Sequence, residues 1–371
     1  MDFKEQLEKK YEKEMEQLKQ NKPNLMLVGG SGVGKSSLIN KIFGGLVAKV
    51  GAGEPVTRAI DRHASPESLI NIFDTMGYET QYSGAPKDEV NKFENNVLVE
   101  INQRKKYDLS EQIHIIWYCI AITNHRVFDY DIDNIKGLQR SNIPLFVVFT
   151  KCDEDTEDSH GKGVTAEAFK KTLSENGLGG VKCFETASEG ELSFELDVLI
   201  EESCNALTHE GLRKAFAVAQ IHNIPLKRTQ AHSIIHSAAA AAAAAAVTPL
   251  PCADAPVITG IQVAMAMGLA KIYGFSNLGD SAMALLKTQL VSILGKQLVA
   301  SLTKFIPVLG SIVNASVAVS LTEALGWSLV AIYEKVLEEY LKTGKEPVWA
   351  QIFSSDILAL FVSQKMESSK K

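Results

Sequence analysis

Residues 29–36 read GGSGVGKS and constrain the fold of this chain more than any other segment. They match the pattern G-x-x-x-x-G-K-[ST] in full, with an apolar strand candidate at 24–29 before them and a helix candidate at 35–43 after them. Glycines let a backbone wrap phosphate oxygens, so that amide N–H groups and the helix N-terminus face the anion. We therefore predict a phosphate-binding loop that opens an α/β domain.

The side chains of this loop have different expected roles. Lys35 would bring a compact cation to the β- and γ-phosphates of a nucleotide, and the Ser36 hydroxyl would coordinate Mg²⁺. The residues expected to contact the nucleotide here are Gly30, Ser31, Gly32, Val33, Gly34, Lys35, Ser36 and Ser37.

Residues 74–77 read DTMG and directly follow an apolar strand candidate at 68–73. Asp74 can hold Mg²⁺ through a water molecule, and the Gly77 amide can meet the γ-phosphate. The D-x-x-G pattern is weak alone, but its position after the phosphate loop makes it informative.

Two later segments select the base of the nucleotide. Residues 150–153 read TKCD, and an aspartate there accepts from guanine N1–H and the 2-amino group, a pairing that adenine cannot offer. Residues 186–188 read TAS, a loop that would offer a backbone N–H to the guanine carbonyl oxygen. The residues expected around the base are Thr150, Lys151, Asp153, Thr186, Ala187 and Ser188. These segments favour GTP and GDP over adenine nucleotides.

Apolar runs and amphipathic stretches alternate through this part of the chain, which predicts a mainly parallel sheet with helices on both faces. Strands are expected at 24–29, 68–73, 112–122, 143–149 and 181–186, and helices at 35–43, 86–106, 129–140 and 164–176. Residues 190–222 are predicted to form one or two amphipathic helices that close the domain.

Composition divides the 371 residues into two kinds of sequence. Residues 1–226 carry 26 Lys and Arg against 35 Asp and Glu, whereas 237–333 hold only seven charged residues. A hydrophobic content of 46% excludes wholesale disorder, and a net charge of −6 argues against a nucleic-acid-binding protein. Five scattered cysteines and a charged start without an apolar segment are typical of a reducing compartment and of a chain without a secretory signal.

The series GGSGVGKS, DTMG, TKCD and TAS resembles the G1, G3, G4 and G5 motifs of Ras-like and Era-like (translation-factor-class) GTPases over about residues 24–205. This resemblance implies a P-loop G domain that hydrolyses GTP with Mg²⁺ as cofactor. It also implies that Thr57, in the segment GEPVT, is the switch I threonine and second Mg²⁺ ligand. Lys35, Thr57 and Gly77 are then the expected catalytic residues, and Ser36, Thr57 and Asp74 the metal ligands.

The chain departs from this pattern in ways that affect hydrolysis. Tyr78 stands where many relatives have the glutamine that orients water, so we expect slow hydrolysis by the isolated protein. Met76 replaces a common proline, and Gly32 replaces the asparagine of potassium-activated relatives, so no K⁺ requirement is expected. Arg58 and Arg126 are candidate transition-state arginines, although a surface or structural role is favoured for each.

The second half of the chain resembles an uncharacterised helical domain found behind bacterial G domains. Nine alanines followed by TPLPCADAP carry the resemblance, which covers roughly 229–340 and implies membrane association without catalytic residues. The uncharged stretches 237–253 and 305–322 fit either a packed helical domain or a shallow membrane insertion, and we favour the membrane. We expect His232 and His236 to be helix-surface or packed residues rather than ligands.

These inferences predict four segments: an amphipathic helix at 1–22, a GTPase domain at 23–225, an apolar helical, membrane-associated domain at 226–345 and a C-terminal helix with its tail at 346–371. The N-terminal helix is expected to dock on its own domain, with partner binding or a coiled coil as the alternative. The segment 223–237 is predicted to be the junction between the two large domains.

We expect a GTPase whose switch regions, 46–61 and 74–86, act on the helical domain at a membrane facing the cytoplasm, or otherwise in the cytoplasm. Two alternatives remain open from the sequence. One is a dynamin-like or immunity-type GTPase activated by homodimerisation through its G domain, which would remodel membranes. The other is a soluble, nucleotide-dependent adaptor with little hydrolysis. No nucleic-acid partner is expected in any of these.

Overall fold

The structure, a computed structural model, divides into two compact units. One unit is Gln17–Asn223, and the other is Ile224–Lys371 together with Met1–Glu16. We predicted boundaries after residues 22 and 225, so the units divide a few residues earlier at both places. The structure describes residues 9, 12–13, 16–44, 54–57, 60–64, 68–75, 93–157, 163–187, 194–247, 254–275 and 315–343. The predicted C-terminal helix and tail at 346–371 lie outside them.

The first unit contains a seven-stranded sheet in the order β2-β3-β4-β1-β5-β6-β7. β1 pairs in parallel with β4 and β5, and the parallel pairing continues through β6 to β7, whereas β2 and β3 join at one edge as antiparallel strands. The strands are β1 Asn24–Val28, β2 Glu54–Thr57, β3 Ile60–His63, β4 Asn71–Thr75, β5 Ile115–Ala121, β6 Leu145–Thr150 and β7 Lys182–Glu185. The five predicted strands are present, and the sequence did not predict β2 or β3.

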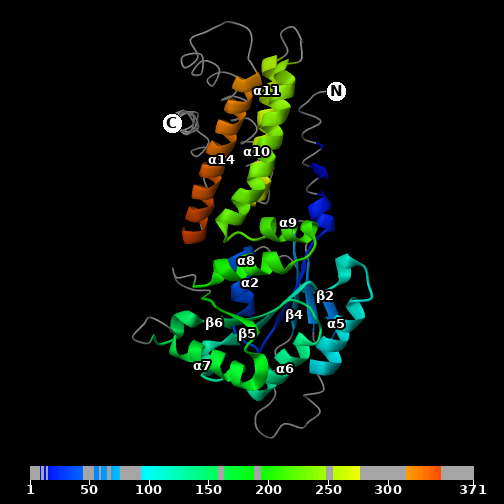
Figure 1. Cartoon of the computed structure of the whole chain (residues 1–371), viewed down its shortest axis with the longest axis vertical. Coiled ribbons are helices and arrows are strands. Elements are labelled where there is room, and N and C mark those ends of the chain that lie inside the picture. Colours follow the sequence, from blue (N-terminus) through cyan, green and yellow to red (C-terminus); the bar gives the residue numbers. More distant parts are fainter. Residues whose placement is uncertain are drawn as a thin grey trace. The chain divides into compact units, whose positions relative to one another are not determined.

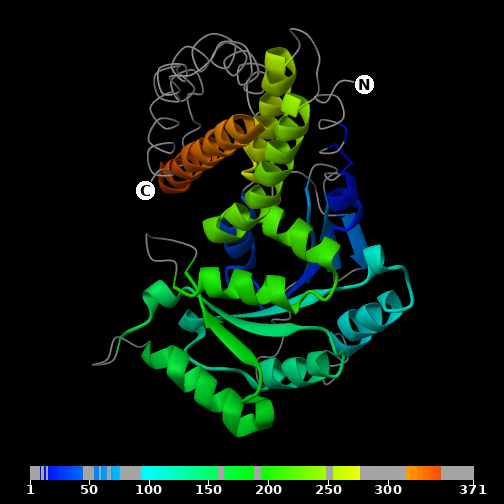
Figure 2. The same cartoon turned by 45° about the horizontal axis from the view of Figure 1, so that its top comes forward.

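Helices cover both faces of this sheet, as predicted. α2 and α8 lie over one face, and α5, α6 and α7 lie over the other (Figures 1 and 2). Their bounds are α2 Lys35–Phe43, α5 Val99–Arg104, α6 Asp129–Gln139, α7 Val164–Leu173, α8 Leu196–Ala206 and α9 Glu210–Ala219. The predicted helix at 86–106 begins outside the described residues; from Glu94 to Leu98 it is a π-helical turn that continues into α5.

Successive side chains of β5 point to opposite faces of the sheet, so this one strand contacts the helices on both faces. The buried Trp117 ring stacks on Phe43 of α2 at a centroid distance of 6.3 Å, and its Nε1 donates to Ser203 Oγ of α8 at 3.0 Å. The next residue, Tyr118, points to the opposite face and donates its hydroxyl hydrogen to Asp131 Oδ1 of α6 at 2.7 Å. Because successive strand residues face opposite sides, a near-continuous apolar run is what a sheet covered on both faces needs.

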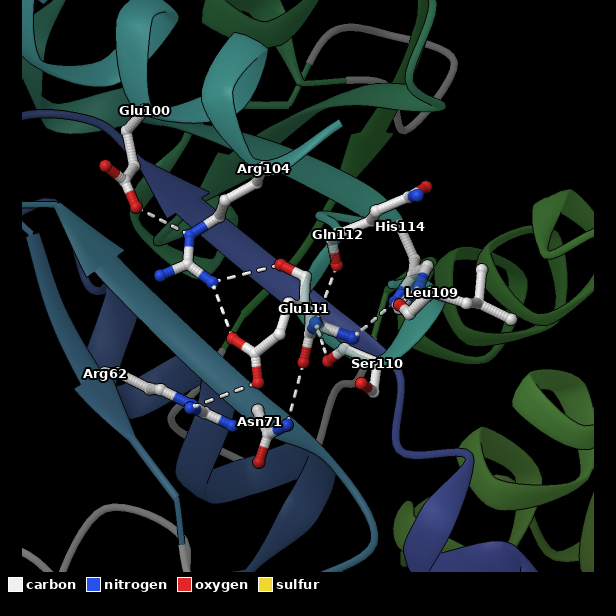
Figure 3. Close-up of polar contacts among 10 residues, drawn as sticks. Arg62, Asn71, Glu100, Arg104, Leu109, Ser110, Glu111, Gln112 and His114 are labelled. Atoms are coloured by element: carbon white, nitrogen blue, oxygen red, sulfur yellow. Dashed lines mark hydrogen bonds and ion pairs between the residues drawn. The ribbon is translucent and has the colours of Figure 1, made fainter. Parts of the chain in front are cut away.

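A polar network lies around the segment that leads into β5. Figure 3 shows the Arg104 guanidinium between two carboxylates: its Nε donates to Glu100 Oε1 at 2.7 Å and its Nη1 to Glu111 Oε2 at 3.2 Å. The Arg104 guanidinium carbon also lies 4.6 Å from the centre of the Phe73 ring of β4. These contacts fix α5 and the turn at 109–111 to the sheet.

His114 joins the same turn to the start of β1. Its Nδ1 accepts from the Asn24 backbone N–H at 2.8 Å, and its Nε2 lies 2.8 Å from the Leu109 carbonyl oxygen, to which it can donate. Both contacts are satisfied together only by the neutral ring, because a protonated Nδ1 cannot accept. Burial lowers the pKa of His114 below its ordinary 6.5, with the charge of His209 acting in the same direction and the bond to Leu109 opposing it.

We therefore expect the first unit to lose stability as the pH falls. A lowered folded-state pKa contributes stability that is present above the unfolded pKa of about 6.5 and is lost as the pH falls through the folded value. Urea unfolding at about pH 7.5 and about pH 5.5 should show a smaller loss in His114→Gln than in the native chain, because the titrating group is gone. An equal loss in both proteins would contradict the assignment.

Within its described residues, the second unit contains three long helices that pack against one another: α10 Ile224–Val247, α11 Asp254–Ile272 and α14 Ala315–Thr343. The predicted junction at 223–237 includes the boundary between the units, after Asn223, and from Ile224 onward it forms the first half of α10. Pro225 lies in the first turn of this helix, where the missing N–H costs nothing. Small residues allow close packing: a Cβ added at Gly326 of α14 would lie 2.8 Å from Ile235 Cγ1 of α10.

Charged side chains join these helices near one end of α10. Arg228 forms a two-point contact with Glu334 of α14, at 2.9 and 2.5 Å, and the Tyr273 hydroxyl donates to the same carboxylate at 3.0 Å. Lys227 is fully buried and donates to the Ile272 carbonyl oxygen at 2.7 Å. Among the described residues, no helix is both long and apolar enough to cross a membrane.

Candidate nucleotide-binding site

The glycine-rich loop after β1 has the backbone that its sequence requires. Gly29 has φ +146° and lies against β5, so that an added Cβ would collide with the Cys119 carbonyl oxygen. Gly34 has φ +92° and is the N-cap of α2, a left-handed conformation that other residues adopt at a cost. These glycines bring the loop backbone close to the helix N-terminus, where amide N–H groups can face an anion.

Lys35 is held at the centre of this loop. Its side chain is buried, and its Nζ donates to the carbonyl oxygens of Gly29 and Gly30 at 2.9 Å each. Val33 is also buried and accepts at its carbonyl oxygen from Thr150 Oγ1. Of the five other contact residues predicted from Ser31 to Ser37, Gly34 is partly buried, and Ser31, Gly32, Ser36 and Ser37 are exposed.

A Gly29→Ala substitution tests whether this close approach shapes the loop. We expect it to destabilise the first unit by about 2–4 kcal/mol, since the new Cβ meets backbone and φ is unfavourable. Gly180→Ala is the matched control, because a Cβ there meets nothing within 4 Å, and it should change stability by less than about 0.5 kcal/mol. Urea unfolding followed by tryptophan fluorescence measures both, and equal stability of the two variants would contradict the expectation.

Asp74, in β4, lies beside the loop with one oxygen available. Its Oδ1 lies 3.9 Å from Lys35 Nζ, and it is buried without a hydrogen-bond partner in the described part of the chain. Burial raises the pKa of Asp74, an effect that Lys35 and His63 oppose and Asp61 reinforces. A buried carboxylate oxygen of this kind fits a cation, and the exposed Ser36 hydroxyl on α2 supplies the oxygen donor that Mg²⁺ prefers.

Two titratable neighbours of Asp74, Asp61 and His63, were not predicted from the sequence. Asp61 pairs directly with Asp74 across β3 and β4, and His63 of the same strand has a buried Nδ1 without a partner among the described residues. No motif signals these positions, because they approach Asp74 only through the register of β3 on β4.

The TKCD and TAS segments lie next to each other at the ends of β6 and β7. Cys152 N–H donates to the Thr186 carbonyl oxygen at 3.1 Å, and Thr186 N–H donates to the Phe149 carbonyl oxygen at 2.8 Å. Lys151 adopts a left-handed conformation with φ 58°, and Asp153, two residues later, is exposed. Because Thr150 also bonds to Val33, these loops and the glycine-rich loop meet at one edge of the sheet.

Several residues of the predicted site lie outside the part of the chain that the structure describes. Thr57 ends β2, but its side chain lies outside the described set. The other positions outside it are Arg58, Met76, Gly77, Tyr78 and Ser188. Arg126 is described: it is exposed, and its guanidinium carbon lies 4.5 Å from the centre of the Phe128 ring.

Comparison with known proteins finds similarity in the first unit. Residues 24–151 match the family described as "50S ribosome-binding GTPase". The probable GTP-binding protein EngB of Aquifex aeolicus is 28% identical over 175 residues, which cover 47% of this chain and 87% of that protein. Neuronal-specific septin-3 of Mus musculus is 25% identical over 174 residues, which cover 42% of this chain and 49% of the septin, about half its length. A crystal structure of a probable GTP-binding protein engB aligns at TM-score 0.32 and 18% identity, covering 52% of this chain and 99% of that one.

The family match coincides with the strands and loops that form the site. It begins at Asn24, the first residue of β1, and ends at Lys151, within the TKCD segment. The first unit of this chain therefore contains a GTP-binding P-loop GTPase domain.

Proposed function

We propose that this chain is a GTP-controlled switch that binds GTP with Mg²⁺, hydrolyses it to GDP and phosphate, and transmits its nucleotide state to the helical unit. The observation that carries the proposal is the meeting of three loops at one sheet edge, connected by the bond from Thr150 to Val33. A cation at Lys35, an available carboxylate oxygen at Asp74 and an exposed Asp153 there match the phosphates, the metal ion and the base of one ligand.

Each residue has a separate task in this proposal. The Lys35 ammonium group, which now donates to the carbonyl oxygens of Gly29 and Gly30, would donate to the β- and γ-phosphates. The Asp153 carboxylate would accept hydrogen bonds from N1–H and the 2-amino group of guanine. Ser36, Asp74 and Thr57 would hold Mg²⁺, which when bound neutralises charge that develops on the phosphate oxygens. The Gly77 amide would meet the γ-phosphate, and the TAS segment would face the guanine carbonyl oxygen.

We further propose that the helical unit associates with a membrane surface that faces the cytoplasm. Only seven charged residues between 237 and 333 support this, because so apolar a segment is costly to expose to water. Ribosome binding, which the family description names, is not part of the function proposed for this chain. The excess of Asp and Glu in residues 1–226 disfavours contact with an RNA backbone.

The test is phosphate release from GTP and from ATP by the full chain, with and without liposomes, together with liposome flotation in GTP, GDP and no nucleotide. The proposal expects slow release from GTP alone and flotation that depends on nucleotide. GTP turnover no greater than that of Lys35→Ala would overturn the enzymatic part, and absence of flotation in every state would favour a soluble adaptor.

A second candidate is activation by homodimerisation through the G domain. The observation that favours it is Tyr78, which occupies the position of a water-orienting glutamine and leaves a catalytic group to be supplied from elsewhere. Turnover per molecule should then rise with protein concentration, and a constant value would exclude this form of the proposal.

A further inference from the structure

Two histidines on α10 lie on the same exposed face. His232 and His236 are four residues apart, one turn of the helix, so their side chains are neighbours on its surface. Both are exposed, in agreement with a helix-surface position, and neither contributes to the packed core. Two histidines at this spacing are the arrangement by which a helix can bind one metal ion through two imidazoles.

The two rings lie close enough to share one metal ion. Their Nε2 atoms lie 3.1 Å apart, with ring centroids 4.1 Å apart and planes inclined by 71°. Two imidazole nitrogens that each bind a transition metal ion at about 2.0–2.1 Å, at an angle near the tetrahedral or octahedral value, lie roughly 3 Å from each other. The separation of the two nitrogens therefore suits one metal ion, provided that the rings turn so that both lone pairs face it.

A carboxylate from a different helix orients one of the rings. Glu323 of α14 places Oε1 3.1 Å from His236 Nδ1. If Nδ1 carries the proton and donates it to the carboxylate, Nε2 of the neutral ring keeps its lone pair, and that lone pair faces His232. A carboxylate bound to the second nitrogen of a histidine is the usual support of a metal-binding imidazole.

We propose that His232 and His236 form a two-histidine site for a divalent transition metal ion, with Glu323 as a positioning residue. Imidazole donors select Zn²⁺, Ni²⁺ or Cu²⁺ rather than Mg²⁺, so the site is chemically distinct from the proposed nucleotide site. In the part of the chain that the structure describes, no three His, Cys, Asp or Glu side chains surround one point. The site is accordingly an open chelate, whose other positions are filled by water or by an external ligand.

Trp327 gives a direct way to observe binding. Its ring centre lies 5.6 Å from that of His232, so Ni²⁺ or Cu²⁺ bound between the histidines should quench its fluorescence. The full chain is titrated with NiCl₂ and followed by fluorescence and by calorimetry. Saturable binding with quenching is expected, and Trp327→Phe should lose the quenching while keeping the calorimetric affinity.

Variants separate this site from other metal ligands. His232→Ala and His236→Ala should each weaken Ni²⁺ binding by at least about 10-fold, and Glu323→Gln by about 10-fold through loss of ring orientation. His125→Ala, at an exposed histidine of the other unit, is the matched control and should bind as the native chain does. Helix content by circular dichroism verifies folding. Native-like Ni²⁺ affinity in both histidine variants, or no binding by the native chain, would overturn the proposal and leave a hydrogen bond between the rings as the explanation of their geometry.

Discussion

Replacing Lys35 with alanine is expected to weaken GTP binding by about 100-fold, which corresponds to about 2.7 kcal/mol. Removing one partner of a buried, hydrogen-bonded charge pair costs about 2–5 kcal/mol, and the lysine cation would be that partner for the phosphates. Equilibrium binding of a fluorescent GTP analogue to the full chain measures the loss.

The structure suggests why this lysine cannot be replaced by a neighbour. Its ammonium group is fixed by two carbonyl oxygens of the loop, and no other Lys or Arg lies in residues 24–40. Lys171→Ala is the matched control, because this lysine of α7 has a side chain that is 77% exposed and pairs only with a surface carboxylate at 3.8 Å in the described contacts. Equal affinities for Lys35→Ala and Lys171→Ala would refute the role of Lys35.

The central sheet could be predicted, and the loops of the candidate site could be located, because their signals are local. The phosphate loop, Asp74 and the TKCD segment are each short, contiguous and placed at a strand end, and parallel strands bring such ends to one edge. By contrast, β2 and β3 contain four residues each, with charged positions such as Glu54 and Asp61. β3 pairs with β4 and β2 pairs with β3 at one edge of the sheet, and no apolar pattern in the sequence reveals this pairing.

Two other features depended on distant parts of the chain. The segment 223–237 contains proline and charged residues, which are typical of linkers, yet Pro225 suits a first helical turn and the charged Lys227 and Arg228 find partners on α11 and α14. Likewise the spacing of His232 and His236 is visible in the sequence, but Glu323, which orients one ring, comes from a helix far along the chain. Local patterns predict which side chains share a face, and only packing decides what that face contacts.

An Asp153→Asn substitution is expected to lower GTP affinity by about 100-fold or more and to raise the affinity for xanthosine triphosphate. Guanine presents two donors, N1–H and the 2-amino group, whereas xanthine has a carbonyl oxygen in place of the amino group. An asparagine amide can donate to that oxygen. Toward guanine, the substitution removes the charged carboxylate acceptor, which is worth about 1.5–3 kcal/mol for each hydrogen bond.

Competition of GTP and xanthosine triphosphate for one labelled nucleotide measures the change in preference. Glu154→Gln is the control, since it neutralises another exposed carboxylate at the next position of the same turn and should leave the preference for GTP unchanged. Because the Asp153 side chain is exposed, its replacement should not disturb folding. A change in the preference between the two nucleotides would therefore report on recognition of the base. If both variants keep the native order of affinities, the base is read by another group, and the TAS loop, which is bonded through Thr186 to Cys152, is the next part of the site to test.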